Sequence, residues 1–195
     1  MIGKLRPATV DDSEFCYTLH RQSLGWVIAE VFGGWDDAVQ REFHARWFDP
    51  ARLEIIEDDD ATPIGVLDVQ EGTDHTYLSR IELLPEYQNR GIGSAVIRDL
   101  LTDGRSVRLH VFTLNSRARE LYARLGFRVD GEHDGRLEMV AHTGREPRPV
   151  LTGRMIALES VRAVLQRARV LASQSPDPNA DPGPSANESR CDSVR

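Results

Sequence analysis

A glycine-containing turn, Gln88-Asn89-Arg90-Gly91-Ile92-Gly93, offers the most specific chemistry in this sequence. It follows an apolar run that ends at Leu84-Pro85 and precedes a helix-like run over residues 94–101. The N-terminus of a helix presents unpaired N–H groups and the positive end of the helix dipole, so it can bind an anion. Glycines in the turn leave room for a phosphate to reach the backbone. The turn therefore predicts a ligand that carries a diphosphate.

The turn lacks the features of two common phosphate-binding motifs. The Lys-Ser/Thr pair that ends a P-loop does not follow the glycines, and the third glycine of the dinucleotide fingerprint is missing. These differences disfavour a nucleoside triphosphatase and an NAD-dependent enzyme. Taken alone, the turn is also compatible with an ordinary connection between a strand and a helix.

The elements around this turn form a mixed α/β pattern. Short runs of β type predict seven strands, at residues 4–8, 53–57, 64–69, 77–84, 107–112, 127–129 and 137–140. Apolar residues at helical spacing predict four helices, which begin after Thr9, near Trp35, at Ser94 and near Ala118. The resulting order is β-α-α-β-β-β-α-β-α-β-β. It describes a mixed α/β domain in which a strand–helix–strand unit carries the turn.

Three regions are predicted along the chain. Residues 1–143 hold the α/β domain. Residues 144–172 combine a linker with an Arg-rich amphipathic helix, whose apolar stripe could pack on the domain or form a dimer contact. Residues 173–195 are rich in Pro, Ser, Asp and Asn, which predicts a disordered tail. A monomer and a homodimer both remain open.

Composition limits the partners and the compartment. A formal net charge of −7 disfavours nucleic acid as the chief partner and mildly favours cationic ones. No apolar run approaches the roughly 20 residues that span a bilayer, so no membrane partner is expected. Neither the histidines nor the cysteines show metal-ligand spacing, so no metal is expected. Cys16 and Cys191 make a poor disulfide framework, which favours a cytoplasmic location.

Two parts of the chain resemble the signatures of the GCN5-related N-acetyltransferase (GNAT) superfamily. Residues 83–93, LLPEYQNRGIG, resemble its acyl-CoA signature, in which a Q/R-x-x-G-x-G/A turn follows the fourth strand and opens the third helix. Residues 109–115, LHVFTLN, and 118–127, ARELYARLGF, resemble its second signature. The resemblance covers roughly residues 3–142. It implies the α/β fold of that superfamily, a mixed sheet of about six to seven strands with four helices.

The resemblance also implies a donor and the residues that bind it. Acetyl-CoA would be the co-substrate, and the strand edge at Leu83 and Leu84 would hydrogen-bond its pantetheine amide. In the superfamily the fourth and fifth strands splay apart near their ends, and the pantetheine arm enters between them. Asn115 would contact this arm. Backbone N–H groups would hold the pyrophosphate, and they belong to Gln88, Asn89, Arg90, Gly91, Ile92, Gly93 and Ser94.

Tyr122 is implied to protonate the departing CoA thiolate. Asn115 is seven positions before it, so both residues lie near one face of a helix. A phenol with an ordinary pKa of ~10 is protonated at neutral pH and can donate a proton to sulfur. The alternative role for Tyr122 is that of a core aromatic residue, because it also fits the apolar stripe of its helix.

The general base has two candidates, Glu82 and His110. An ammonium substrate must lose a proton before its nitrogen can attack a thioester, so a carboxylate or an imidazole nearby is useful. Glu82 lies in a β run where an apolar residue is more ordinary, and His110 lies in the next predicted strand. If these strands are neighbours, both side chains could flank the splayed region. A solvated or structural role remains the alternative for each.

The acceptor amine is expected to bind near the first two helices and their connection, residues 24–37. Trp26, Glu30 and Phe32 combine aromatic surface with a carboxylate, which suits a cationic or amphipathic amine, whereas core packing is favoured for Trp35. The expected reaction is direct transfer of an acetyl group to a primary amine. A small cationic metabolite is favoured over a protein or peptide amine. A non-catalytic acyl-CoA-binding sensor or partner-binding module is the competing class.

Overall fold

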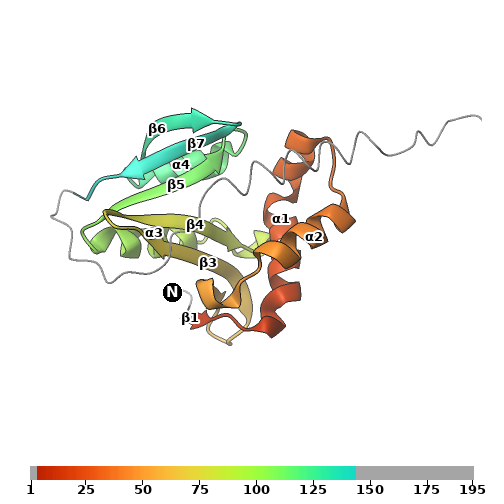
Figure 1. Cartoon of the computed structure of the whole chain (residues 1–195). Coiled ribbons are helices and arrows are strands. Elements are labelled where there is room, and N and C mark those ends of the chain that lie inside the picture. Colours follow the sequence, from red (N-terminus) through yellow and green to blue (C-terminus); the bar gives the residue numbers. More distant parts are fainter. Residues whose placement is uncertain (1–3, 144–195) are drawn as a thin grey trace, which may run out of the picture. The chain divides into compact units, whose positions relative to one another are not determined.

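A seven-stranded mixed sheet forms the frame of the protein (Figure 1). The computed structural model describes residues 4–143, so the predicted linker, helix and tail over residues 144–195 fall outside the described residues. The strands are β1 (Lys4–Pro7), β2 (Leu53–Glu57), β3 (Pro63–Glu71), β4 (His75–Leu83), β5 (Ser106–Phe112), β6 (Arg128–His133) and β7 (Arg136–Ala141). The helices are α1 (Ser13–Phe32), α2 (Asp37–Trp47), α3 (Ile92–Thr102) and α4 (Ser116–Arg124). Three short 3₁₀ turns are η1 (Val10–Asp12), η2 (Pro50–Arg52) and η3 (Pro85–Tyr87).

The strands lie in the order β1-β2-β3-β4-β5-β7-β6. Every neighbouring pair is antiparallel except β4 and β5, which are parallel. A parallel pair needs a crossover connection, and α3 supplies it. Within residues 4–143, the α/β fold with seven strands and four α-helices confirms the architecture predicted for this domain.

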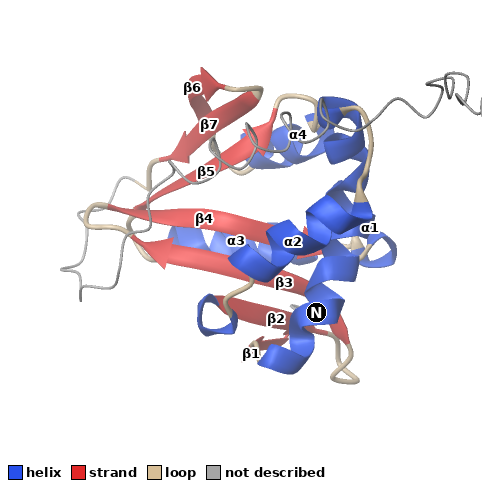
Figure 2. Ribbon diagram, turned by 45° about the vertical axis from the view of Figure 1, so that its right-hand side comes forward, coloured by secondary structure: helices blue, strands red, loops and turns tan. Residues whose placement is uncertain are grey.

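The helices cover both faces of the sheet (Figure 2). α1 and α2 lie on one face, over β2 to β4, and α3 lies on the opposite face. The core on the α1 side includes Cys16, Leu19, Ile55 and Val66. The larger core, on the α3 side, joins β4, β5 and β7 to α3 and α4; it includes Leu78, Ile97, Leu109, Val111, Tyr122 and Met139.

A β-bulge in β4 changes which side chains face each helix layer. Asp68 of β3 pairs with Arg80, whereas Val69 pairs with Leu78, so Ser79 is the extra residue. Leu78 and, past the bulge, Ile81 therefore both pack in the α3-side core. Because neighbouring side chains in a strand alternate, the residues on either side of Ile81, Arg80 and Glu82, point to the α1 side.

The boundaries differ from the predicted ones mainly at turns. The expected helix after Thr9 begins with the 3₁₀ turn η1, and α3 begins two positions earlier than Ser94. β6 and β7 are longer than predicted because Asp134 and Gly135, with φ of 50° and 73°, make a tight turn between them. Gly131 lies inside β6, beyond the predicted end of this strand at residue 129, at a register shift.

Within residues 4–143, none of the helices combines the length and the apolar character needed to cross a membrane.

Candidate active site

The edge of β4 that faces β5 is unpaired over its second half. The two strands pair from His75↔Ser106 to Leu78↔Leu109 and no farther, although β4 continues to Leu83 and β5 to Phe112. Figure 1 shows β5 diverging from β4 beyond this point. We call the unpaired region between residues 79–83 and 110–112 the β4–β5 gap. The unpaired backbone of β4 can take an extended ligand there, as an edge strand does.

Leu83 and Leu84 differ in where their backbone groups point. The Leu84 N–H donates to the Ile64 carbonyl at 2.9 Å, so it is occupied by β3. Consecutive amides in a strand alternate in direction, so the N–H and C=O of Leu83 face the gap. The Leu83 carbonyl accepts a hydrogen bond from Gln88 Nε2 at 2.8 Å. Of the two N–H groups predicted to meet pantetheine, the one directed to the gap is that of Leu83.

The turn before α3 presents a run of backbone N–H groups. Asn89 and Gly91 have positive φ values, 61° and 86°, which bend the chain sharply before the helix. The first bond of α3 runs from the Ala95 N–H to the Gly91 carbonyl at 2.9 Å, and no side chain caps the helix. The donors ahead of that bond belong to Ile92, Gly93 and Ser94. A Cβ on Gly91 would meet no atom within 4 Å, so an anion has room to approach. These donors and the helix dipole fit a diphosphate.

Side chains hold this turn in place. Gln88 ties it to the end of β4 through the bond to Leu83. Tyr87 donates its hydroxyl to Asp58 Oδ2 at 3.0 Å, which ties η3 to the turn between β2 and β3. The Arg90 guanidinium lies 5.0 Å from the centre of the Tyr87 ring, so a positive charge sits beside the backbone donors.

Tyr122 lies on α4, in the core on the α3 side of the sheet. Its ring packs at 5.6 Å from the ring of Phe127, and 8% of the residue's surface is exposed. Burial raises the pKa of Tyr122 to about 12. Within residues 4–143 its hydroxyl forms no hydrogen bond with the protein. Tyr122 is therefore a core aromatic residue, and it is also a protonated phenol whose O–H has no acceptor among the described residues. The position is compatible with both roles predicted for it.

Asn115 is the N-cap of α4. Its Oδ1 accepts a hydrogen bond from the Ala118 N–H at 3.1 Å. The cap uses only the oxygen of the side-chain amide, so Nδ2 is left to donate to a ligand. The same residue can therefore start the helix that carries Tyr122 and contact the pantetheine arm.

Glu82 is buried beneath α1, with 4% of its side chain exposed. His20 Nδ1 lies 2.9 Å from Oε1, the Ser23 hydroxyl donates to Oε2 at 3.2 Å, and Arg80 Nε lies 3.8 Å from Oε1. Burial pushes the pKa of Glu82 upward, but His20, Arg80 and Ser23 together hold it below its ordinary value. Glu82 is therefore an ionised carboxylate that the protein itself surrounds with hydrogen-bond donors and positive charge.

His110 lies on β5 at the start of the gap. Its neighbours Leu109 and Val111 point into the α3-side core, so His110 points to the same face of the sheet as Glu82. Its Nδ1 is 2.8 Å from the Tyr77 hydroxyl, and burial lowers its pKa. His110 is therefore neutral at pH 7 and paired with a phenol. No contact joins it to Glu82, but both border the gap.

His20 and Ser23 join this site although no sequence feature indicated them. Both are on α1, three positions apart, which places them on one face of the helix. Their partner Glu82 is 62 residues from His20 in the sequence, so nothing local connects them. Arg80 was missed as well, because only the bulge at Ser79 turns it toward α1.

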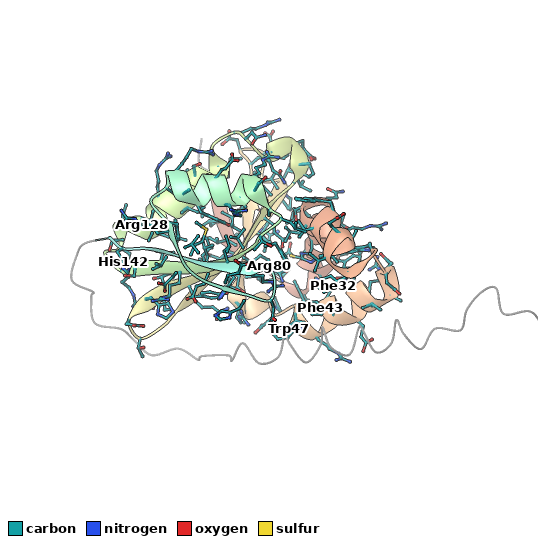
Figure 3. All side chains as sticks on the ribbon, turned by 90° about the horizontal axis from the view of Figure 1, so that it is seen from above. Phe32, Phe43, Trp47, Arg80, Arg128 and His142 are labelled. Carbon is teal, nitrogen blue, oxygen red and sulfur yellow. The ribbon has the colours of Figure 1, made fainter. Side chains whose placement is uncertain are left out.

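The residues predicted to line the acceptor side divide into packed and exposed ones. Trp35 packs against α1, since its ring lies 6.2 Å from those of Tyr17 and His20. Trp26 and Phe32 are 55% and 37% exposed. In Figure 3 Phe32 is followed by Phe43 and Trp47 across the α1–α2 pair, and Arg80 lies where that pair meets the sheet.

Comparison with known families shows which family the chain belongs to. The model of the acetyltransferase (GNAT) family matches residues 14–127, which is more than half of the chain. The chain belongs to this family. It is therefore a GNAT acetyltransferase that depends on acetyl-CoA, as the two signatures predicted. A search of curated proteins finds no match to this GNAT chain.

Solved structures share the fold of this acetyltransferase. The PaiA N-acetyltransferase from Thermoplasma acidophilum, in complex with coenzyme A, is 20% identical with a TM-score of 0.58, over 73% of this chain and 99% of its own. YjaB from Escherichia coli, in its apo form, is 18% identical with a TM-score of 0.56, over 74% and 99%. An N-acetyltransferase from Staphylococcus aureus is 14% identical with a TM-score of 0.54, over 70% and 98%. At these identities the likeness concerns the fold.

Proposed function

We propose that this protein transfers the acetyl group of acetyl-CoA to a primary amine by direct attack. The observation that carries the proposal is the β4–β5 gap, where the pairing of the two strands stops at Leu78↔Leu109 and the rest of the β4 edge is unpaired. On the α1 face lie the carboxylate of Glu82 and its partner His20. On the α3 face lies the protonated phenol of Tyr122. A thioester held in the gap would have a proton acceptor on one side and a proton donor on the other.

The residues proposed to hold the donor lie at the end of β4, in the turn before α3 and at the start of α4. The Leu83 N–H would bind the pantetheine amide, and Asn115 Nδ2 would contact the same arm. The N–H groups from Asn89 to Ser94 would bind the pyrophosphate. The Gln88 N–H, which was also predicted to do so, is occupied, because it donates to the Pro85 carbonyl at 3.2 Å. When bound, acetyl-CoA supplies the acetyl thioester that the amine attacks. The neighbour from Thermoplasma acidophilum was determined with coenzyme A, which supports this assignment by analogy of fold.

Tyr122 is proposed to stabilise the leaving sulfur. Its raised pKa of about 12 keeps the phenol protonated throughout the neutral range. A thiol has an ordinary pKa of ~8.5, so complete proton transfer from such a phenol to a thiolate is uphill. We therefore assign the hydroxyl as a hydrogen-bond donor to the leaving sulfur, and its proton moves to sulfur only as the second proton of the amine nitrogen replaces it.

A small cationic amine is the favoured acceptor. The exposed aromatic surface of Trp26 and Phe32 can contact a cation, and Glu30 adds an exposed carboxylate on the same helix. The net charge of −7 attracts cations in general and repels nucleic acid. A protein or peptide amine is the second candidate. The cytoplasmic location, and the choice between a monomer and a homodimer, stay predictions.

Release of free thiol from acetyl-CoA tests the proposal. The full chain is incubated with amino acids, polyamines, aminoglycosides and peptides, and the acetylated product is identified by mass spectrometry. Amine-dependent thiol release with matching acetylated product is expected. If coenzyme A binds by calorimetry but no amine is acetylated, the protein is a non-catalytic acyl-CoA-binding module instead.

A further inference from the structure

The contacts of Glu82 leave it no free oxygen for an acceptor amine. Oε1 faces His20 Nδ1 at 2.9 Å, and Oε2 accepts a hydrogen bond from Ser23 at 3.2 Å. Only 4% of the Glu82 side chain is exposed, against 22% for His20. A substrate on the α1 face would therefore meet the imidazole before it could meet the carboxylate.

The hydrogen bond to Glu82 determines which nitrogen of His20 is basic. An ionised carboxylate can only accept, so in the neutral imidazole the proton lies on Nδ1 and the lone pair on Nε2. Within residues 4–143, Nε2 forms no hydrogen bond with the protein. Trp35, whose ring centre is 6.2 Å away, packs against the ring and limits its orientation.

We propose that His20 Nε2, rather than Glu82 or His110, accepts the proton of the acceptor ammonium, with Glu82 as the positioning residue. This inference rests on the proposed acetyl transfer to an amine. His20 takes one proton from the ammonium, and the freed nitrogen pair forms the C–N bond. The C–S bond then breaks, and Tyr122 gives its proton to sulfur. The second proton leaves nitrogen as the amide forms and restores the Tyr122 hydroxyl, so one proton in total passes from His20 to solvent.

Other charged or titratable groups lie around His20. Glu82 Oε1 lies 2.9 Å from its Nδ1, Arg80 Nε lies 3.8 Å from the same Glu82 oxygen, and His44 is close enough to interact with it electrostatically. Because the base must be neutral, kcat/KM for the amine should rise with pH as His20 loses its proton. The proposal therefore predicts an acidic limb in the pH–rate profile that belongs to this one residue.

His20→Asn tests the proposal, because Asn retains an N–H near the position of Nδ1 but has no basic nitrogen. His75→Asn is a matched control. His75 Nδ1 also contacts a carboxylate, at 2.6 Å from Asp74 Oδ1, but His75 lies at the end of β4 opposite to Glu82. We expect His20→Asn to lower kcat/KM for the amine about 100-fold or more and to abolish the acidic limb. The KM for acetyl-CoA should stay within about twofold, because His20 is not among the residues proposed to bind acetyl-CoA. His75→Asn should leave all three quantities unchanged.

The native protein provides an independent test if His20→Asn does not fold. A long-range ¹H–¹⁵N spectrum of the wild-type enzyme should show His20 protonated on Nδ1, with a pKa equal to that of the acidic limb. A limb that persists in His20→Asn, one that disappears in His110→Asn, or a His20 pKa that differs from the limb would overturn the proposal. Failure of the proposed function looks different, because the wild-type enzyme would then acetylate no amine at all.

Discussion

Gly65 of β3 approaches β4 so closely that a Cβ there would lie 2.5 Å from the carbonyl oxygen of Glu82. The same Cβ would lie 2.6 Å from Leu83 Cδ2. Neither contact is tolerated in folded proteins, so the glycine determines how near the two strands can lie. The position of the last residues of β4, at the edge of the gap, therefore depends on the absence of a side chain on the neighbouring strand.

Gly65→Ala should push the end of β4 away from β3. We expect the free energy of unfolding to fall by about 1–3 kcal/mol, as for other overpacked sites. Turnover should fall as well, because Glu82 and the Leu83 N–H would move together. Gly131→Ala is the control, since a Cβ there meets nothing closer than 3.8 Å. Denaturant unfolding and acetyl transfer measured on both variants provide the check, and equal effects would contradict this role for Gly65.

Gly91→Ala should weaken binding of acetyl-CoA. An alanine at φ of +86° costs about 1–2 kcal/mol, and relief of this strain would rotate the N–H groups proposed to hold the pyrophosphate. We expect the Kd of coenzyme A to rise about tenfold, equivalent to about 1.4 kcal/mol. Gly135→Ala carries a similar strain, at φ of +73°, in the turn between β6 and β7. Calorimetry should show a loss of affinity in the first variant only, although both lose stability.

Tyr122→Phe should separate turnover from binding. The substitution removes a hydroxyl that has no hydrogen-bond partner within residues 4–143, so stability should be unchanged or slightly higher. We expect kcat to fall about 100-fold while the Kd of coenzyme A stays constant. Steady-state kinetics and calorimetry on the same preparation measure both. Unchanged kcat would leave Tyr122 with its packing role alone.

Asp12 should make stability depend on pH in the acidic range. It lies 2.8 Å from the Arg6 guanidinium, and this hydrogen bond lowers the pKa of Asp12 to about 2 in the folded protein. In the unfolded chain the pKa is ~3.9, so the stabilisation is complete above about pH 4 and is lost as the pH falls toward 2. We expect a contribution of up to about 2 kcal/mol. In urea unfolding, the Asp12→Asn variant should be less stable than the wild-type protein at pH 6, and the difference in free energy of unfolding should shrink at pH 3.

The parts of the site that could be predicted are those with local signals. The turn around Gly91 combines a strand end, a glycine with positive φ and a helix start within a few residues. A turn between a strand and a helix could therefore be predicted from the local sequence. The relative placement of Asn115 and Tyr122 could be predicted because one caps the helix that carries the other, whereas their roles stay predictions. Membership of the GNAT family could be predicted because both signatures occur at the expected places in the order of strands and helices.

The parts that could not be predicted depend on contacts between distant segments. His20 meets Glu82 only because α1 crosses the face of β4 at that point. The direction of Glu82 itself depends on the bulge at Ser79, and no residue type in the run around it signals an inserted position. Glu82 was therefore recognised as unusual, but its partners and its burial required the fold.

The parallel pairing of β4 with β5 covers four residue pairs, and it is the only strand pairing between the β1–β4 half of the described sheet and the β5–β7–β6 half. A ligand bound in the gap would form hydrogen bonds to the unpaired strand edges there, in place of the pairing that the two strands lack. Binding would then stabilise both halves together. The free energy of unfolding would rise by RT ln(1 + [L]/Kd), where [L] is the donor concentration, and the melting temperature would rise with it. The two halves of this enzyme's sheet would be hydrogen-bonded along the full length of β4 only while the enzyme carries its donor.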